Sequence, residues 1–157
     1  MKRHILLGLL LSAVAVPAAT AETAPAAVTF EEGAVAQSLT GAAGDPAEGA
    51  KVMSSRALGN CVACHTVSAM PDVAFQGNVG PSLDGAAGRW EEAQLRGIVS
   101  DAKMTFDGTV MPSFYKTGPY IRPGDAFTGK AAEGELPPLL TAQQIEDVVA
   151  YLLTLKD

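Results

Sequence analysis

The clearest pattern of apolar positions lies near the C-terminal end of the chain. Thr141 followed three residues later by Gln144 forms a capping box, which is typical of a helix start. Beyond it, apolar side chains recur at helical spacing: Ile145, Val148, Val149, Leu152 and Leu155. The pattern predicts a helix that begins after Thr141 and buries one continuous face.

Two earlier segments also carry helix signals. Asp45 suits the cap and Pro46 the first position of a helix that we expect to run through Leu58 into Gly59. A second helix is expected over residues 90–103. Its apolar side chains are available for one face: Trp90, Leu95, Ile98 and Val99.

Glycine and proline interrupt the rest of the chain. Gly77, Gly80-Pro81 and Gly85 exclude a long helix after residue 65, and residues 115–139 hold four prolines and four glycines, which predicts a sizeable loop. No internal repeat, heptad pattern or convincing strand pair is present. The expected fold class is therefore all-α with long loops.

The N-terminal residues have the pattern of a secretory signal peptide. Lys2 and Arg3 precede an apolar run over 5–16 that is too short to span a bilayer, and Ala19-Thr20-Ala21 fits the cleavage rule. We expect cleavage after Ala21 and export to the periplasm, with an uncleaved membrane anchor as the alternative. Residues 22–44 then form an extended or loosely packed N-terminal arm, in which Glu31 to Leu39 could be one helix.

Export would leave a strongly acidic chain. Removal of residues 1–21 takes away Lys2 and Arg3 and no acid, so 9 basic and 17 acidic residues remain, a net charge of −8. This balance disfavours nucleic acid and anionic membranes as partners.

The two cysteines stand three positions apart, directly before a histidine, in Cys61-Val62-Ala63-Cys64-His65. This pattern is typical of covalent attachment of one haem c, with His65 as an axial ligand of the iron. Three alternatives remain. A thioredoxin-like redox pair would stand near a βαβ pattern, a zinc site would need four ligands, and a Cys61–Cys64 disulfide would close a short, strained ring.

The sixth ligand of the iron must come from another residue type, because His65 is the one histidine left after cleavage. A methionine, a lysine, a terminal amine, water or a partner protein could supply it. We favour Met111, because Pro112 keeps the preceding residue out of helical geometry and so fixes it in a loop. Met104 is the replacement candidate, and Met111 could instead fill the core.

The remaining two methionines are poorer candidates. Met53 lies on the first predicted helix and should pack in the core, while Met70 follows His65 too closely to reach the opposite face of a haem. Gly80-Pro81 also has two interpretations. The Pro81 carbonyl could accept a hydrogen bond from the His65 ring, or the pair could be an ordinary turn.

These residues together resemble the class I cytochromes c over residues 45–157, the predicted cytochrome domain. The attachment motif, Gly80-Pro81-x-Leu83, Met111-Pro112-x-Phe114 and the Thr141 helix match that family. The resemblance implies the class I fold around one covalently bound haem, and it makes Gly49 the small residue where the two terminal helices cross, beside Tyr151. Met53 departs from the family, which usually has an aromatic side chain there.

Within this class the chain is similar to the SoxX family of small cytochrome subunits. The similarity is carried by the segments 59–65, 77–83, 111–116 and 140–152. It implies a heterodimer with a SoxA-type cytochrome in the SoxAX complex, an L-cysteine S-thiosulfotransferase that joins thiosulfate to a cysteine of the carrier SoxYZ. The SoxX-type haem would accept the released electrons and pass them to a soluble cytochrome c.

No residue of the chain is assigned a catalytic role by this resemblance, because both cysteines are used for haem attachment. The arm at 22–44 and the loop at 115–139 exceed what a minimal cytochrome needs, and we expect them to contact the partner subunit. The alternatives are a free-standing periplasmic electron shuttle and, from a different class, a haem-based sensor.

Overall fold

The computed structural model describes residues 21–121, 123 and 129–156; the predicted apolar run of the signal peptide lies outside them. It contains four α-helices in these ranges: α1 (Pro46–Ser54), α2 (Ala86–Arg89), α3 (Glu92–Asp101) and α4 (Ala142–Leu152). Within the same residues, strand-like pairing is limited to one isolated bridge between Glu31 and Ala34. The all-α prediction is confirmed. The described helices include none with the length and apolarity needed to cross a bilayer.

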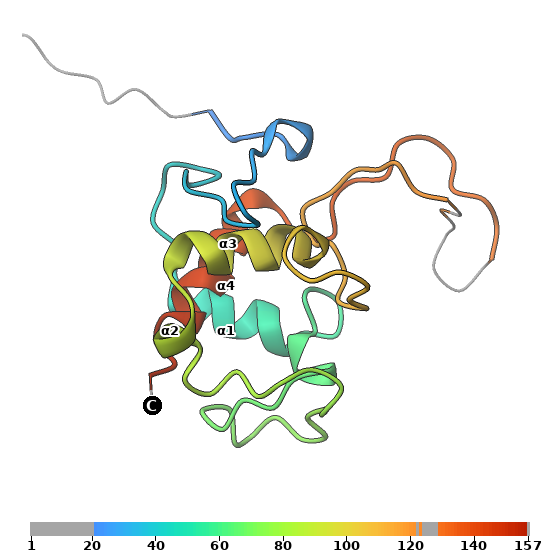
Figure 1. Ribbon diagram of the computed structural model, residues 1–157. Coiled ribbons are helices and arrows are strands. Elements are labelled where there is room, and N and C mark those ends of the chain that lie inside the picture. Colours follow the sequence, from blue (N-terminus) through green and yellow to red (C-terminus); the bar gives the residue numbers. More distant parts are fainter. Residues whose placement is uncertain (1–20, 122, 124–128, 157) are drawn as a thin grey trace, which may run out of the picture.

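Helices α1 and α4 cross at the centre of the molecule, with α3 lying across them (Figure 1). A side chain on Gly49 would bring its Cβ within 2.0 Å of the Asp147 carbonyl oxygen and 2.9 Å of Tyr151 Cβ. Glycine at this position therefore lets the two backbones approach closely. Asp45 connects the same helices, since its N–H donates to Asp147 Oδ1 at 2.8 Å. The contact expected between Gly49 and Tyr151 is present.

The apolar stripe of α4 forms the centre of the core, as predicted. All five of its side chains are buried: Ile145, Val148, Val149, Leu152 and Leu155. Met53 of α1 is fully buried among them, also as expected. The capping box of α4 is present, with reciprocal hydrogen bonds between Thr141 and Gln144.

The boundaries of the other helices differ from the prediction. Helix α1 ends at Ser54 instead of continuing into Gly59, and Asn60 adopts a left-handed conformation (φ 48°) that no α-helix accommodates. Trp90 is extended and precedes α3. Helix α2 was not predicted, because it is a single turn that follows Gly85 in a left-handed conformation (φ 68°).

The prediction of a helix from Glu31 to Leu39 is wrong. Glu32 and Gly33 both have positive φ, and Gly97 of α3 approaches so closely that a Cβ there would lie 1.9 Å from the Gly33 carbonyl oxygen. The arm therefore follows the surface of α3 as irregular chain. It is not loosely packed either, because Val35 and Leu39 are buried in the core.

Residues 115–121 leave the body without regular structure and residues 129–139 return to it, as expected for a long loop (Figure 1). Two backbone hydrogen bonds close its base: Tyr115 N–H donates to the Ser100 carbonyl at 2.9 Å, and Leu140 N–H donates to the Phe114 carbonyl at 3.0 Å. The loop therefore begins and ends on the packed helices.

Candidate functional site

The two cysteines and His65 lie on one tight turn after α1. Cys61–Ala63 form a short 3-10 helix, and the N–H groups of Cys64 and His65 both donate to the Cys61 carbonyl, at 3.1 and 3.0 Å. This turn gathers the three side chains within a few residues of chain. Because α1 ends at Ser54 and does not run into Gly59, this separate 3-10 turn carries the three side chains.

The chemistry of the two thiols argues against a redox pair. Both cysteines are free, with Cys61 half-buried and Cys64 exposed. Burial raises the pKa of the Cys61 thiol to about 11. A reactive redox cysteine needs a lowered pKa, because the thiolate is the nucleophile. Among the described residues, no three or more His, Cys, Asp and Glu side chains lie together so as to hold a metal ion.

The ring of His65 is oriented by the Gly80-Pro81 turn. His65 Nδ1 lies 2.7 Å from the Pro81 carbonyl oxygen, which is the contact that sequence analysis had considered. Because a carbonyl can only accept, Nδ1 carries the proton and Nε2 keeps its lone pair free for a metal. A Cβ on Gly80 would lie 2.2 Å from His65 Cε1, so only glycine permits this close packing.

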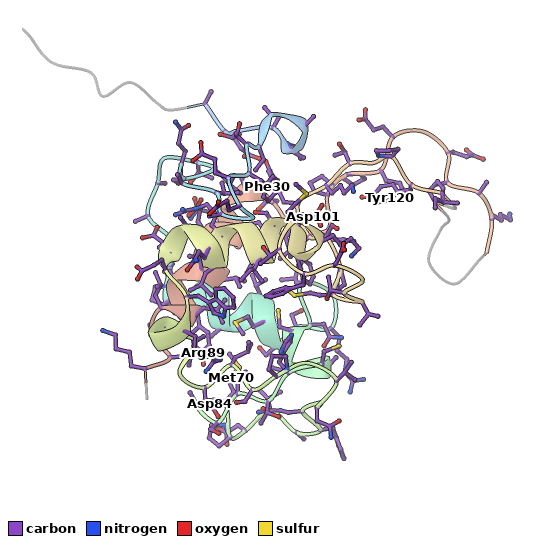
Figure 2. The ribbon with its side chains drawn as sticks, in the orientation of Figure 1. Phe30, Met70, Asp84, Arg89, Asp101 and Tyr120 are labelled. Carbon is purple, nitrogen blue, oxygen red and sulfur yellow. The ribbon has the colours of Figure 1, made fainter. Side chains whose placement is uncertain are left out.

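A set of polar contacts fixes the loop that carries Pro81. The Asp84 carboxylate accepts from the Ser68 N–H at 2.8 Å and from the Ser68 hydroxyl at 2.7 Å. Arg89 of α2 donates to the carbonyls of Asp84 and Ser82, at 2.6 and 2.9 Å. Figure 2 shows Asp84 and Arg89 close together beneath the helices.

These contacts also bear on the charge of Asp84. Hydrogen bonds from Ser68, above all from its hydroxyl, lower the pKa of the Asp84 carboxyl. No local motif predicts the roles of Ser68, Asp84 and Arg89, because the partners lie up to 16 residues apart in the sequence.

Met111 lies in the irregular segment after α3, half-buried and packed against the core. Its N–H donates to Thr109 Oγ1 at 3.2 Å, and its carbonyl accepts from Lys103 Nζ at 2.6 Å. Met104 is 51% exposed at the end of the Ala102–Met104 3-10 turn, while Met53 and Met70 are buried. Of the two candidate ligands, Met111 is the one whose side chain packs inward.

The donor set suits a covalently held haem. Two thiols on one turn can form thioethers, the oriented imidazole offers Nε2, and a thioether sulfur comes from a separate segment. Apolar exposed side chains belong to the segments that carry these donors: Leu58, Phe75, Val79, Met104, Phe106 and Val110. A porphyrin plate would supply apolar surface for side chains of this kind to cover.

Comparison with known proteins identifies a family and a similar solved structure. A family model described as cytochrome c matches residues 46–156. A crystal structure of SoxXA from P. pantotrophus matches with 62% sequence identity and a TM-score of 0.85, over 87% of this chain and 100% of that chain. No match was found among the curated proteins.

Proposed function

The chain belongs to the cytochrome c family, and we propose that it is the SoxX-type subunit of a SoxXA complex, in which it accepts and passes on single electrons during thiosulfate oxidation. Its fold is the all-α class I cytochrome c fold, and its cofactor is covalently bound haem c. The similarity to the SoxXA structure supports the subunit role.

The observation that carries the electron-transfer role is the hydrogen bond between His65 and Pro81. It holds the imidazole in one tautomer and one orientation, with Nε2 available for iron. Cys61 and Cys64 would hold the porphyrin covalently, and Met111 would supply the opposite ligand. Haem c, when bound, supplies reversible one-electron redox chemistry at its iron.

The same residues argue against a catalytic role for this chain. Both thiols would be consumed by attachment, and the His65 imidazole and Met111 thioether would both be used to hold the iron, so none of these groups would be left to act on a substrate. We therefore propose a non-catalytic subunit of an L-cysteine S-thiosulfotransferase.

The SoxX-type assignment also implies a cellular location and a set of partner proteins. The expected cleavage after Ala21 would release a mature chain of residues 22–157. The mature chain would act in the periplasm beside a SoxA-type cytochrome. It would receive electrons when thiosulfate is joined to SoxYZ and pass them to a soluble cytochrome c.

We propose that the 115–139 loop contacts the SoxA-type partner. Its described residues project from the body (Figure 1), and Ile121 among them is 99% exposed. Tyr120 and Leu139 of the same loop are exposed as well, and several apolar side chains presented to solvent on one loop are suited to burial in an interface. The arm at 22–44 could extend the same interface, although its buried residues Val35 and Leu39 also serve the core.

The first experiment is a native pull-down of the tagged mature chain from its own periplasm, with covalent haem stained in the recovered proteins. We expect a second haem-containing chain in equal amount and haem staining of this chain. If this chain is recovered alone but stained, a free-standing electron shuttle replaces the SoxXA subunit. If it is unstained, the covalent haem assignment fails.

A point variant then tests the loop. Ile121→Asp should weaken association with the partner, while the haem spectrum stays unchanged. Ala47→Asp is the matched control, because it adds the same charge at an exposed position of α1, outside the loop. If Ile121→Asp weakens association no more than Ala47→Asp does, the loop is not the interface.

A further inference from the structure

The segment that carries Met111 lacks regular structure between Thr105 and Ser113, so backbone hydrogen bonds of a helix or sheet do not hold it. Polar side chains hold it instead. Lys103 Nζ donates to the Met111 carbonyl at 2.6 Å, and Thr109 Oγ1 accepts from the Met111 N–H. The peptide groups on both sides of the Met111 side chain are therefore fixed.

Asp101 secures the same segment two residues further on. Its carboxylate is largely buried, and Oδ1 accepts from the Ser113 hydroxyl at 2.6 Å and from the Lys103 N–H at 3.2 Å. Lys116 Nζ lies 3.8 Å from the other oxygen. Figure 2 shows Asp101 at the end of α3, where the chain leaves the helix.

Asp101 and Lys103 both lie at the C-terminal end of α3, which is packed against the core. Asp101 is the last residue of α3, whose Leu95 and Val99 are buried, and Lys103 lies in the 3-10 turn that follows. The end of α3 also holds the chain that follows the Met111 segment, because Tyr115 N–H donates to the Ser100 carbonyl. The end of α3 thus forms hydrogen bonds with the chain on both sides of Met111.

We propose that Asp101 and Lys103 are positioning residues that hold the Met111 thioether in place as an axial haem ligand. This inference rests on the proposed assignment of Met111. Without these contacts the segment between Thr105 and Ser113 would move as a flexible loop, and the thioether would leave the iron more often. An external ligand could then enter the vacated position.

The test measures how fast carbon monoxide binds to the reduced, haem-loaded protein, because binding requires the sixth ligand to leave. Lys103→Met keeps an apolar stem of similar length and removes the donor, and Ser113→Ala removes the hydroxyl that binds Asp101. A hydrogen bond to a charged group changes a local equilibrium by about tenfold or more. We therefore expect each variant to bind carbon monoxide about tenfold faster than wild type.

Two controls separate positioning from general damage. Lys51→Met removes an exposed lysine that pairs with Glu48 on α1, and should leave the rate unchanged. Lys103→Arg keeps a long cationic donor and should restore most of the slow binding. Absorption of the ferric–thioether charge-transfer band, measured on the same samples, should weaken in Lys103→Met and Ser113→Ala and persist in Lys103→Arg.

The outcomes distinguish the positioning role from the ligand assignment. If Met111→Ala binds carbon monoxide rapidly but Lys103→Met and Ser113→Ala bind it at the wild-type rate, Met111 remains the ligand and the positioning role is overturned. If Met111→Ala binds no faster than wild type, Met111 is not the ligand and the inference falls with that assignment.

Discussion

Glu146 should be among the most sensitive positions for stability outside the haem site. Its carboxylate is 4% exposed and accepts from Arg96 Nε at 2.9 Å and from the Leu39 N–H at 2.6 Å. Arg96 in turn donates to the Val35 carbonyl at 3.0 Å. The Arg96–Glu146 pair therefore joins α3, α4 and the N-terminal arm in the interior.

Glu146→Ala would leave the Arg96 guanidinium without its buried partner and the Leu39 N–H without an acceptor. Removing one partner of a buried ion pair typically costs about 3–5 kcal/mol. Typical unfolding free energies are about 5–15 kcal/mol, so a large share of the stability would be lost. For a domain of this size the melting temperature should fall by about 10 °C or more.

The assay is urea and thermal unfolding of the haem-loaded protein, followed by far-ultraviolet circular dichroism. Glu92→Ala is the matched control, because Glu92 pairs with the same arginine but its side chain is 59% exposed. An exposed pair contributes less than about 1 kcal/mol. Limited proteolysis should also cut the arm faster in Glu146→Ala, since Leu39 and Val35 lose their anchor.

A double variant tests why Glu146→Ala loses stability. Arg96→Met combined with Glu146→Leu replaces the pair by apolar side chains and should recover much of the stability, because no buried charge is left unpaired. Glu146→Ala and Glu92→Ala with equal effects would refute the reasoning. Failure of the double variant to recover stability would show that the hydrogen bonds to the arm, and not the unpaired charge, dominate the cost.

Three further predictions concern other contacts. Gly80→Ala should displace the His65 ring, since the new Cβ would lie 2.2 Å from Cε1, and a redox titration should show a shifted reduction potential; an unchanged potential would contradict the packing argument. Gly49→Ala should separate α1 from α4 and cost about 1–3 kcal/mol in urea unfolding, as overpacking does, whereas a neutral effect would mean that the crossing adjusts freely. Burial, aided by Glu22, raises the pKa of Tyr115 from 10.0 to about 12. The contribution of this phenol to the free energy of unfolding is therefore complete below pH 10 and is lost as the pH rises towards 12. Tyr115→Phe should reduce this loss of stability at alkaline pH, and an equal loss in both proteins would show that Tyr115 is not its cause.

Local signals accounted for much of the fold. Asp45 and Thr141 cap α1 and α4 as predicted, because a capping side chain bonds to backbone groups only two or three residues away. The spacing of apolar residues in α4 likewise predicted its buried face. The attachment motif is equally local, since its two cysteines and one histidine act within five consecutive residues.

Other features depended on contacts across the fold. The arm segment from Glu31 to Leu39 has helical composition, yet the close approach of Gly33 to Gly97 and the Arg96–Glu146 pair hold it as irregular chain. Helix α1 stops at Ser54, where the chain turns towards Cys61. Tertiary packing overrode local propensity at both places.

The sequence alone thus determined the helix starts, the core face of α4 and the residues suited to hold a haem, because each depends on neighbours along the chain. Only the tertiary structure decided which polar groups orient those residues. Arg96 and Glu146 lie 50 residues apart, His65 and Pro81 lie 16 apart, and Lys103 and Met111 lie 8 apart. Such pairs meet only when the helices pack, and no periodicity along the chain encodes them.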